Sequence, residues 1–492
     1  MKLSDITDPT ADVLLNARAY VSDLAVPTVR LGVTGLARAG KTVFITALVR
    51  NLVAGGRLPF FRAAADGRLI SAHLQPQPDD AVPRFTYEEH LAILAANPPE
   101  WPQSTRRISQ LRLTLTYKPL SRVRRALDAT LGSSRLHVDI VDYPGEWLVD
   151  LALLEQDYAA WSAQALADAD ASTRQSHAGA FRSFIASLDA DAAADEQLAL
   201  KGAELFTRYL AAVRDAAPHV STLGPGRFLM PGDVAGSPLL TFFPFAFAGL
   251  APSGSLAAML ERRFESYKSH VVKPFFRDHF SRLDRQIVLV DALAALDQGS
   301  DGLADLSRAM DHVLRAFRPG ANTWASSIFR RRVDRILFAA TKADHLNHQS
   351  HDSLEALLSA IAGDAMARAA FAGADVKALA IAALRATREA EATIAGEALP
   401  CIIGTPLAGE RVEDVTFDGK TETVLFPGDL PADPKALLSG HIKLRAGHEA
   451  DVRVLRFRPP RVTLETAGGT QAALPHIRLD RAIDFLIGDR LE

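Results

Sequence analysis

Cysteine, long apolar runs and an excess of one charge are all missing from this sequence. Cys401 is the only cysteine among 492 residues, so a disulfide framework within the chain is excluded. The longest apolar run, at 239–251, is interrupted by Pro244 and falls short of the ~18–20 residues that a membrane-spanning helix needs. The balance of 55 basic against 58 acidic residues gives no reason to expect a nucleic-acid partner.

A secretory signal and internal repeats are missing as well. Residues 1–10 are polar and acidic, without the charged-then-apolar pattern of a signal peptide, so we expect a cytoplasmic protein. No repeat or low-complexity tract occurs in the sequence. The length favours about three domains, or one domain with large insertions. A content of 48% hydrophobic residues is enough for a sizeable core.

A glycine-rich phosphate-binding motif is the strongest pattern present. Residues 35–42 have the P-loop spacing G-x-x-x-x-G-K-[ST], after a predicted strand at 29–33 and before a predicted helix at 43–53. Gly35 and Gly40 permit a backbone in which successive N–H groups point inward toward phosphate oxygens. The positive end of the following helix faces the same anion. This motif therefore predicts a nucleotide site.

The residues of this loop have distinct predicted roles. Lys41 should reach the β- and γ-phosphates, and the Thr42 hydroxyl should ligate Mg²⁺. The backbone amides predicted to bind the diphosphate belong to Arg38, Ala39, Gly40, Lys41, Thr42 and Val43.

An acidic motif follows a later strand. Asp142 ends a predicted strand at 136–141 and opens the tetrapeptide D-Y-P-G. A carboxylate in this place is a second ligand for Mg²⁺, directly or through water. Gly145 would let a backbone N–H approach the γ-phosphate closely.

A second acidic motif predicts base selection. Thr341, Lys342, Ala343 and Asp344 follow a buried strand at 336–340. Asp344 would accept hydrogen bonds from guanine N1–H and N2–H₂, a donor pair that adenine lacks, and the stem of Lys342 would lie along the base. The alternative interpretation is a surface turn.

The order of predicted elements favours an α/β fold with a parallel sheet. The strands at 111–117 and 136–141 have no convincing crossover helix between them, so we expect this pair to be antiparallel. Alanine-rich helical patterning dominates 148–284, which predicts a helical domain inserted into the α/β domain. The predicted parts are 1–147 and 285–390 for the two halves of the nucleotide domain, 148–284 for the insertion, and 391–492 for a β-rich extension whose terminal helix packs on the core.

Finer predictions concern individual segments. A docking helix is expected at 11–24, and 55–101 is expected to be irregular apart from a helix at 86–96. Predicted helices follow at 148–171, 300–317, 352–372 and 479–487, with core strands at 287–291 and 376–384 and strand-like runs in the extension at 399–404, 415–423, 441–444 and 452–457.

The order P-loop, D-x-x-G, T-K-x-D resembles a Ras-like GTPase domain of the translation-factor class. Longer phrases resemble the YcjX-like stress-induced P-loop proteins of bacteria, and they span nearly the whole chain. These phrases are G-V-T-G-L-A-R-A-G-K-T-V-F-I-T-A-L, W-P-Q-S-T-R-R-I-S-Q-L-R-L-T, V-D-Y-P-G-E-W-L, R-Q-I-V-L-V-D, T-K-A-D-H and L-D-R-A-I-D-F-L-I-G-D-R-L. The resemblance implies GTP or GDP binding, slow GTP hydrolysis, a helical insertion beside a Ras-like core, a link to stress response, and an envelope or membrane partner.

Matching to the family places further residues. Thr105 stands where a switch threonine closes on Mg²⁺ when the γ-phosphate is present, with Ser104 beside it in the nucleotide site. The alternative for Thr105 is a helix or strand cap. Ala386, after the strand at 376–384, stands where a backbone N–H meets guanine O6. We expect His345 to border the base.

Two residues that bear on catalysis depart from the usual GTPase pattern. Glu146 stands where many GTPases place a water-orienting glutamine, and a carboxylate beside the γ-phosphate is repelled, so we expect low turnover. Arg38 is a candidate for an arginine in cis that stabilises the charge on the transferring phosphoryl group, and Arg106 and Arg107 are rival candidates. The alternative contacts of Arg38 are solvent or the diphosphate of a neighbouring subunit. The predicted catalytic set is Lys41, Thr105, Arg38 and Gly145.

Three histidines, His345, His348 and His351, recur at three-residue spacing. The pattern favours loop-exposed histidines near a helix start over a metal site, because a site needs two of them on one face and a third ligand.

The function predicted from these motifs is a guanine-nucleotide-dependent switch that hydrolyses GTP slowly, with GTP or GDP and Mg²⁺ as cofactors. One alternative is a P-loop ATPase or kinase in which T-K-A-D is only a turn. Another is a nucleotide-bound scaffold without turnover. Competition between GTP and ATP in a binding titration separates the first two.

Overall fold

The computed structural model describes residues 26–35, 38–103, 107–121, 134–217, 220, 222–247, 249–315, 333–394, 396–412, 414–431, 433–438, 454–466 and 468–492. Several predictions lie outside these residues. They are the helix at 11–24, the strand-like run at 441–444, and the residues Ser104, Thr105 and Arg106.

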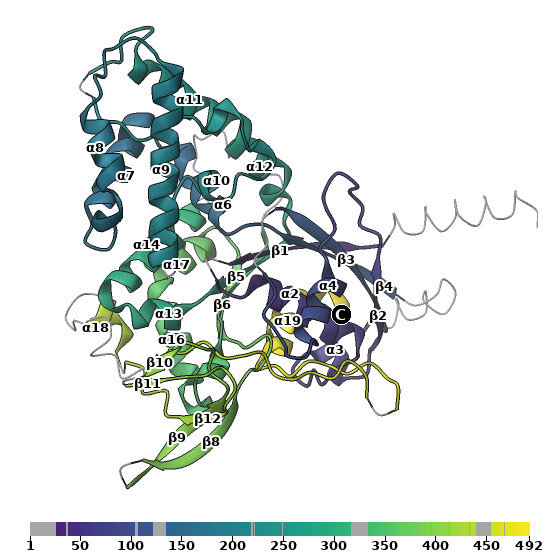
Figure 1. The fold of residues 1–492 in the computed structure, drawn as a ribbon. Coiled ribbons are helices and arrows are strands. Elements are labelled where there is room, and N and C mark those ends of the chain that lie inside the picture. The colour runs from purple at the N-terminus through teal and green to yellow at the C-terminus, as the bar shows by residue number, and fades with distance from the viewer. Residues whose placement is uncertain are drawn as a thin grey trace, which may run out of the picture.

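Within the described chain, a seven-stranded sheet forms the centre of the molecule, in the order β2-β3-β4-β1-β5-β6-β7 (Figure 1). The neighbours from β4 through β1, β5 and β6 to β7 are parallel, whereas β2 pairs antiparallel with β3, and β3 with β4. The predicted α/β class and its antiparallel strand pair are thus confirmed. The strands are β1 (Thr28–Gly35), β2 (Leu69–Gln75), β3 (Ser109–Tyr117), β4 (Ser134–Asp142), β5 (Arg285–Val290), β6 (Arg335–Ala340) and β7 (Asp375–Ala380).

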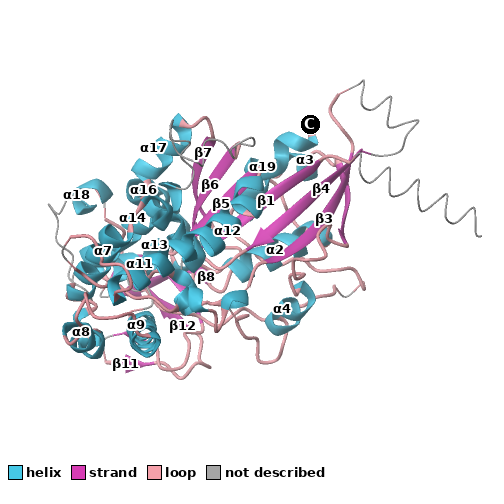
Figure 2. Cartoon of the chain, turned by 90° about the horizontal axis from the view of Figure 1, so that it is seen from above, coloured by secondary structure: helices cyan, strands magenta, loops and turns pink. Residues whose placement is uncertain are grey.

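Alternating side chains of the strands supply two cores, one on each face of the sheet (Figure 2). On β5, Ile287 and Leu289 enter one core, whereas Val288 and Val290 enter the other. The first core is completed by α2 (Lys41–Val53) and α19 (Leu479–Ile487). The second is completed by α13 (Ala292–Asp297), α14 (Gly299–Arg315), α16 (His351–Ile361) and α17 (Gly363–Phe371).

Helices fill the segment between β4 and β5, and Figure 1 shows them standing to one side of the sheet. The single helix predicted at 148–171 is instead interrupted, because Asp157 is extended and accepts a hydrogen bond from the Ala160 N–H at 2.7 Å as an N-cap. The helices are α6 (Glu146–Val149), α7 (Tyr158–Asp170), α8 (Gly179–Ala186), α9 (Glu196–Ala216), α10 (Gly226–Leu229), α11 (Leu256–Tyr267) and α12 (Lys273–Asp278).

The predicted irregular segment at 55–101 is partly regular. It contains α3 (Arg62–Ala65), the edge strand β2 and α4 (Tyr87–Leu94). The prediction missed β2 because this strand has little apolar signal. Ile70 is half exposed, and His73 and Gln75 are polar.

Predictions for the second half of the chain also need correction. The helix at 352–372 divides at Ala362 into α16 and α17, and the strand at 376–384 ends at Ala380. The strand at 415–423 is interrupted by a turn in which Asp418 accepts from the Lys420 N–H at 2.7 Å. Residues 454–457 form only the bridge of Phe457 with Pro406. The extension contains β8 (Arg388–Ile394), β9 (Glu397–Gly404), β10 (Arg411–Val412), β11 (Val415–Thr416), β12 (Thr423–Leu425) and α18 (Pro434–Leu438).

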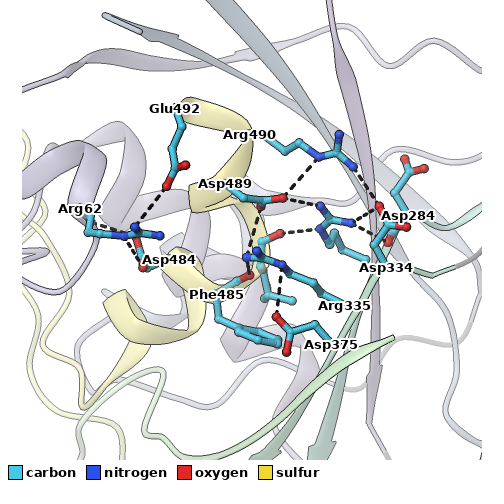
Figure 3. Close-up of polar contacts among 12 residues, drawn as sticks. Arg62, Asp284, Asp334, Arg335, Asp375, Asp484, Phe485, Asp489, Arg490 and Glu492 are labelled. Atoms are coloured by element: carbon cyan, nitrogen blue, oxygen red, sulfur yellow. Dashed lines mark hydrogen bonds and ion pairs between the residues drawn. The ribbon is translucent and has the colours of Figure 1, made fainter. Parts of the chain in front are cut away.

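Arginines on the central strands tie α19 to the sheet (Figure 3). The Arg285 guanidinium, 1% exposed, donates to the Leu486 carbonyl at 3.1 Å and pairs with Asp489 at 2.8 Å. Arg335 donates to the Phe485 carbonyl at 2.7 Å. The last helix of the chain therefore belongs to the same packed unit as β5 and β6. Across the described residues, no helix has both the length and the apolar character to cross a membrane.

We expect Arg285→Met to lower the free energy of unfolding by about 2–4 kcal/mol. The substitution removes the hydrogen bond to the Leu486 carbonyl and a buried ion-pair partner of Asp334 and Asp489. Urea unfolding measures this change. Arg490→Met is the matched control, because Arg490 also pairs with Asp334 but is 44% exposed, so its loss should cost less than about 1 kcal/mol. Equal costs for the two variants would contradict this role of Arg285.

Candidate functional site

The carboxyl ends of the parallel strands meet at one edge of the sheet, the usual place of a ligand site in open α/β folds. β1 ends at Gly35 and its neighbour β4 ends at Asp142. On the other side of β1, Asp291 follows β5, and Thr341 follows β6. Adjacent strands lie about 4.8 Å apart. The P-loop after β1 and Thr341 after β6 are two strand spacings apart, so roughly 10 Å separates them across the sheet.

The described part of the loop between β1 and α2 comprises residues 38–40. Arg38 (φ 59°) and Gly40 (φ 80°) adopt left-handed conformations. A Cβ on Gly35 would lie 3.3 Å from the Leu289 Cβ, so the start of the loop packs tightly on β5. Because α2 begins after a glycine, no capping side chain occupies its first N–H groups, which can bind an anion.

Two of the predicted phosphate and metal residues are in contact, and a third follows Lys41 directly in the chain. The Lys41 Nζ is 3.1 Å from the Asp142 Oδ1, and their side chains are 11% and 1% exposed. The Thr42 hydroxyl donates to the Gln103 carbonyl at 3.5 Å. The ammonium compensates the buried carboxylate. Hydroxyl and carboxylate oxygens are the ligands that Mg²⁺ takes in proteins, so this group fits a magnesium–phosphate site.

The D-Y-P-G segment is buried and leads directly into a helix. The Tyr143 hydroxyl donates to Gln286 at 3.3 Å, and burial raises the pKa of Tyr143 well above its ordinary value. Gly145 is buried and is the N-cap of α6, while Glu146 is half-buried. The side chain of Tyr143 therefore anchors this segment to Gln286, near the start of β5.

The two predicted base motifs are in direct contact. Asp344 is 4% exposed, and its Oδ2 accepts from the Ala386 N–H at 2.7 Å. The Thr387 hydroxyl donates to the Asp344 carbonyl. A carboxylate has about four acceptor positions, so Asp344 retains acceptor capacity beyond this bond.

Asp291 is a residue of this edge to which the sequence reasoning assigned no role. Lys342, in a left-handed conformation (φ 60°), forms an ion pair with the Asp291 carboxylate. Asp291 also caps α13 by accepting from the Ala294 N–H at 3.2 Å. Its position after the apolar run I-V-L-V was the available signal, since it matches the positions of Asp142 and Thr341.

The histidine prediction is wrong for two of the three residues. His345 and His351 are buried rather than exposed, and burial lowers the pKa of both imidazoles. His345 packs edge-on against Phe457, whereas His351 contacts the Ala343 carbonyl at 2.9 Å. His348 pairs with Glu389 at 2.7 Å. The three rings thus contact different groups, and the described residues contain no group of three or more His, Cys, Asp or Glu side chains that could hold a metal ion.

The helical segment contacts the chain directly after Gly145. The Trp147 indole N–H donates to the Met230 carbonyl at 2.9 Å, and the Arg227 guanidinium lies 3.2 Å from the centre of its ring. A Cβ on Gly226 would lie 2.0 Å from the Glu146 carbonyl oxygen, so the two backbones touch. A shift of Glu146 or Trp147 must therefore displace the short helix α10, which contains Gly226 and Arg227.

A buried carboxylate strengthens this junction. Asp150 accepts from the Gly226 N–H at 2.6 Å and from the Tyr267 hydroxyl at 2.5 Å. Burial raises the pKa of Asp150 to about 6. The junction thus contains an acid that can lose its proton near neutral pH.

Comparisons with known proteins agree with this geometry. The model of the YcjX-like family, DUF463, matches residues 29–491. A protein named Ras-like GTPase YcjX from Escherichia coli (strain K12) is 38% identical over 473 residues, covering 94% of this chain and 96% of that protein. A second protein of that name, from Shewanella oneidensis (strain MR-1), is 33% identical over 486 residues, covering 94% of each chain.

We expect stability to depend on the ionisation of Asp150. Its folded pKa of about 6 lies above the ordinary value of 3.8, so its favourable contribution is complete below pH 4 and is lost as the pH rises through 6. Relative to Asp150→Asn, the wild type should lose about 1 kcal/mol between pH 5 and pH 7. Urea unfolding of both proteins at these pH values measures the difference. A difference that does not change with pH would contradict the raised pKa.

Proposed function

The chain belongs to the YcjX-like family, and from this premise we propose that it binds guanine nucleotide with Mg²⁺ and hydrolyses GTP slowly. The observation that carries this proposal is the convergence of Lys41, Asp142 and Asp344 on one edge of the sheet. The two relatives named Ras-like GTPase support the choice of a guanine nucleotide.

In the nucleotide complex, Lys41 would exchange Asp142 for phosphate oxygens, and the amides from Ala39 to Val43 would bind the diphosphate. Thr42 and Asp142 would hold Mg²⁺, joined by Thr105 when the γ-phosphate is present. Bound Mg²⁺ would neutralise part of the phosphate charge. The contact of 3.1 Å between the Lys41 Nζ and the Asp142 carboxylate supports this assignment, because it brings the phosphate-binding and the metal-binding side chains together.

Base selection is assigned to Asp344 and its neighbours. The Asp344 carboxylate would accept from guanine N1–H and N2–H₂. The Ala386 N–H, which donates to Asp344 in this structure, would turn toward O6. Lys342 is held by Asp291, which supports its placement beside the base, and Thr341 leads into this corner from β6. His345 would border the base from its buried position.

Slow turnover is proposed from the residues that stand nearest the reacting phosphate. Gly145 would offer its N–H to the γ-phosphate, and the following carboxylate of Glu146 would orient water poorly. Arg38 is exposed beside the loop and is the proposed arginine for the charge that develops during transfer. Ser104 would complete the nucleotide site beside Thr105.

The nucleotide state would be transmitted to the helical insertion at 148–284. Asp142 and Trp147 bracket the segment that would respond to the γ-phosphate, and the contacts of Trp147 with Arg227 and Met230 of the insertion support direct coupling. In this proposal, 1–147 and 285–390 form the nucleotide domain, and 391–492 form the extension. We also propose a cytoplasmic location. A role in bacterial stress response and a protein partner at the envelope or membrane are proposed on the family resemblance alone.

We expect Asp344→Asn to weaken GDP binding by roughly 5–150-fold, because an amide cannot accept both guanine hydrogen bonds, a loss of about 1–3 kcal/mol. Xanthosine diphosphate, with a carbonyl at C2, should gain affinity, and the weak binding of ADP should not change. Calorimetric titration of the three nucleotides measures these shifts. Asp352→Asn, an exposed carboxylate on α16, is the control. An unchanged preference for guanine in Asp344→Asn would sink the base assignment.

We expect the loop at 224–232 to exchange its amide hydrogens at rates that differ by about fivefold or more between the complexes with GDP and with a non-hydrolysable GTP analogue. The reason is its contact with Trp147 and Asp150. Arg227→Met should reduce this difference. Identical exchange in the loop, while both nucleotides protect residues 38–43, would show that the insertion does not report the nucleotide state.

A further inference from the structure

The segment at 454–478 of the C-terminal extension, here called the C-terminal strap, contains isolated bridges but no helix or strand in its described residues (Figure 1; residue 467 lies outside the described chain). It precedes α19, which the arginines of β5 and β6 hold on the sheet. Its contacts reach three elements that the proposed function assigns to the nucleotide.

The first contact is with the base corner. The Phe457 ring meets the ring of His345 edge-on, with centroids 5.1 Å apart, and belongs to an apolar cluster against which Ala386 packs. The ring lies so close to Gly404 that a Cβ there would be 2.7 Å from it. Phe457 is 3% exposed. The Phe457 ring therefore supports the residue after Asp344, and the cluster to which it belongs supports the residue whose N–H binds Asp344.

The second contact is with the segment that precedes Ser104 and Thr105. The Trp101 indole N–H donates to the Phe457 carbonyl at 2.7 Å. Trp101 lies two residues before Gln103, whose carbonyl accepts from the Thr42 hydroxyl. The backbone of Phe457 thus holds one end of the proposed switch, while its ring supports the base corner.

The third contact is with the helix that follows the P-loop. Arg50 on α2 is 6% exposed and donates to the Ala472 carbonyl at 2.8 Å and to the Gln471 side chain at 3.0 Å, as well as to the Leu464 carbonyl. Beyond this point, the Arg385 N–H donates to the Pro475 carbonyl at 2.8 Å. On the C-terminal side of Phe457, the strap is therefore attached to α2 and to the segment after β7.

We propose that Phe457 is a positioning residue that slows the dissociation of guanine nucleotide, an inference that rests on the proposed function. Release of the base requires the corner of Asp344 and Ala386 to open. Phe457 opposes that opening because its ring backs the corner and its carbonyl is anchored by Trp101. The C-terminal extension thereby joins base recognition to the switch segment.

Dissociation of radiolabelled GDP from the purified full chain tests this role. Phe457→Ala should release GDP about tenfold faster, the loss expected when a packed aromatic contact of about 1.4 kcal/mol is removed. The KM for GTP should rise by a similar factor while kcat stays within about twofold. Phe457→Leu should restore part of the slow release, because it keeps apolar bulk against His345 and Ala386. Trp101→Phe, which deletes the indole donor and part of the ring volume, should accelerate release by a smaller factor.

Leu455→Ala is the matched control. Leu455 belongs to the same apolar cluster and is 4% exposed, so its truncation weakens the extension to a similar degree, which thermal unfolding verifies. Its GDP release should stay within about twofold of the wild type, because a leucine has no aromatic ring that could pack edge-on against His345 as Phe457 does. Equal acceleration in Phe457→Ala and Leu455→Ala would overturn the positioning role.

The remaining outcomes separate the two proposals. A wild type that binds neither GDP nor GTP would overturn the proposed function and this inference with it. A wild type that binds GDP tightly, with unchanged release in Phe457→Ala, would overturn only the inference. Faster release with raised kcat and unchanged KM would also contradict it, because positioning of the base acts on binding.

Discussion

The parallel register of β4, β1, β5 and β6 is the constraint on which the site depends. It brings the P-loop, Asp142, Asp291 and the T-K-A-D loop to one edge, although they are separated by long stretches of chain. There the Lys41 ammonium lies 3.1 Å from a carboxylate that is almost fully buried. A buried charge needs a partner, so the pairing stabilises both side chains while they face the space where an anion would bind.

Two large parts of the chain contact this edge through a few residues each. The helical insertion contacts the segment after Gly145 through Arg227 and Asp150, where backbones touch and little adjustment is possible. The C-terminal strap contacts the base corner through Phe457. Packed interfaces of this kind have few alternative arrangements, so a small shift at the nucleotide can be converted into a larger one elsewhere. The fold thus joins phosphate binding and base binding to different parts of the molecule.

Much of this could be predicted from local patterns. A motif that follows an apolar strand carries its own structural context, which is why Lys41, Asp142 and Asp344 were predicted and are now seen on one edge. The edge strand β2 was missed because its exposed, polar residues lack an apolar period. Asp291 and Phe457 were missed for a different reason. Their partners, Lys342 and His345, are brought to them only by tertiary packing, which no local pattern encodes.

The most direct test of the central claim is a crystal structure of the protein with GDP and Mg²⁺. We expect the diphosphate within hydrogen-bond distance of the amides of residues 39–43, Lys41 drawn away from Asp142 toward the phosphates, and the Asp344 carboxylate on the N1 edge of guanine. A nucleotide bound elsewhere on the chain, or a base turned away from Asp344, would contradict the assignment of this edge as a guanine-nucleotide site.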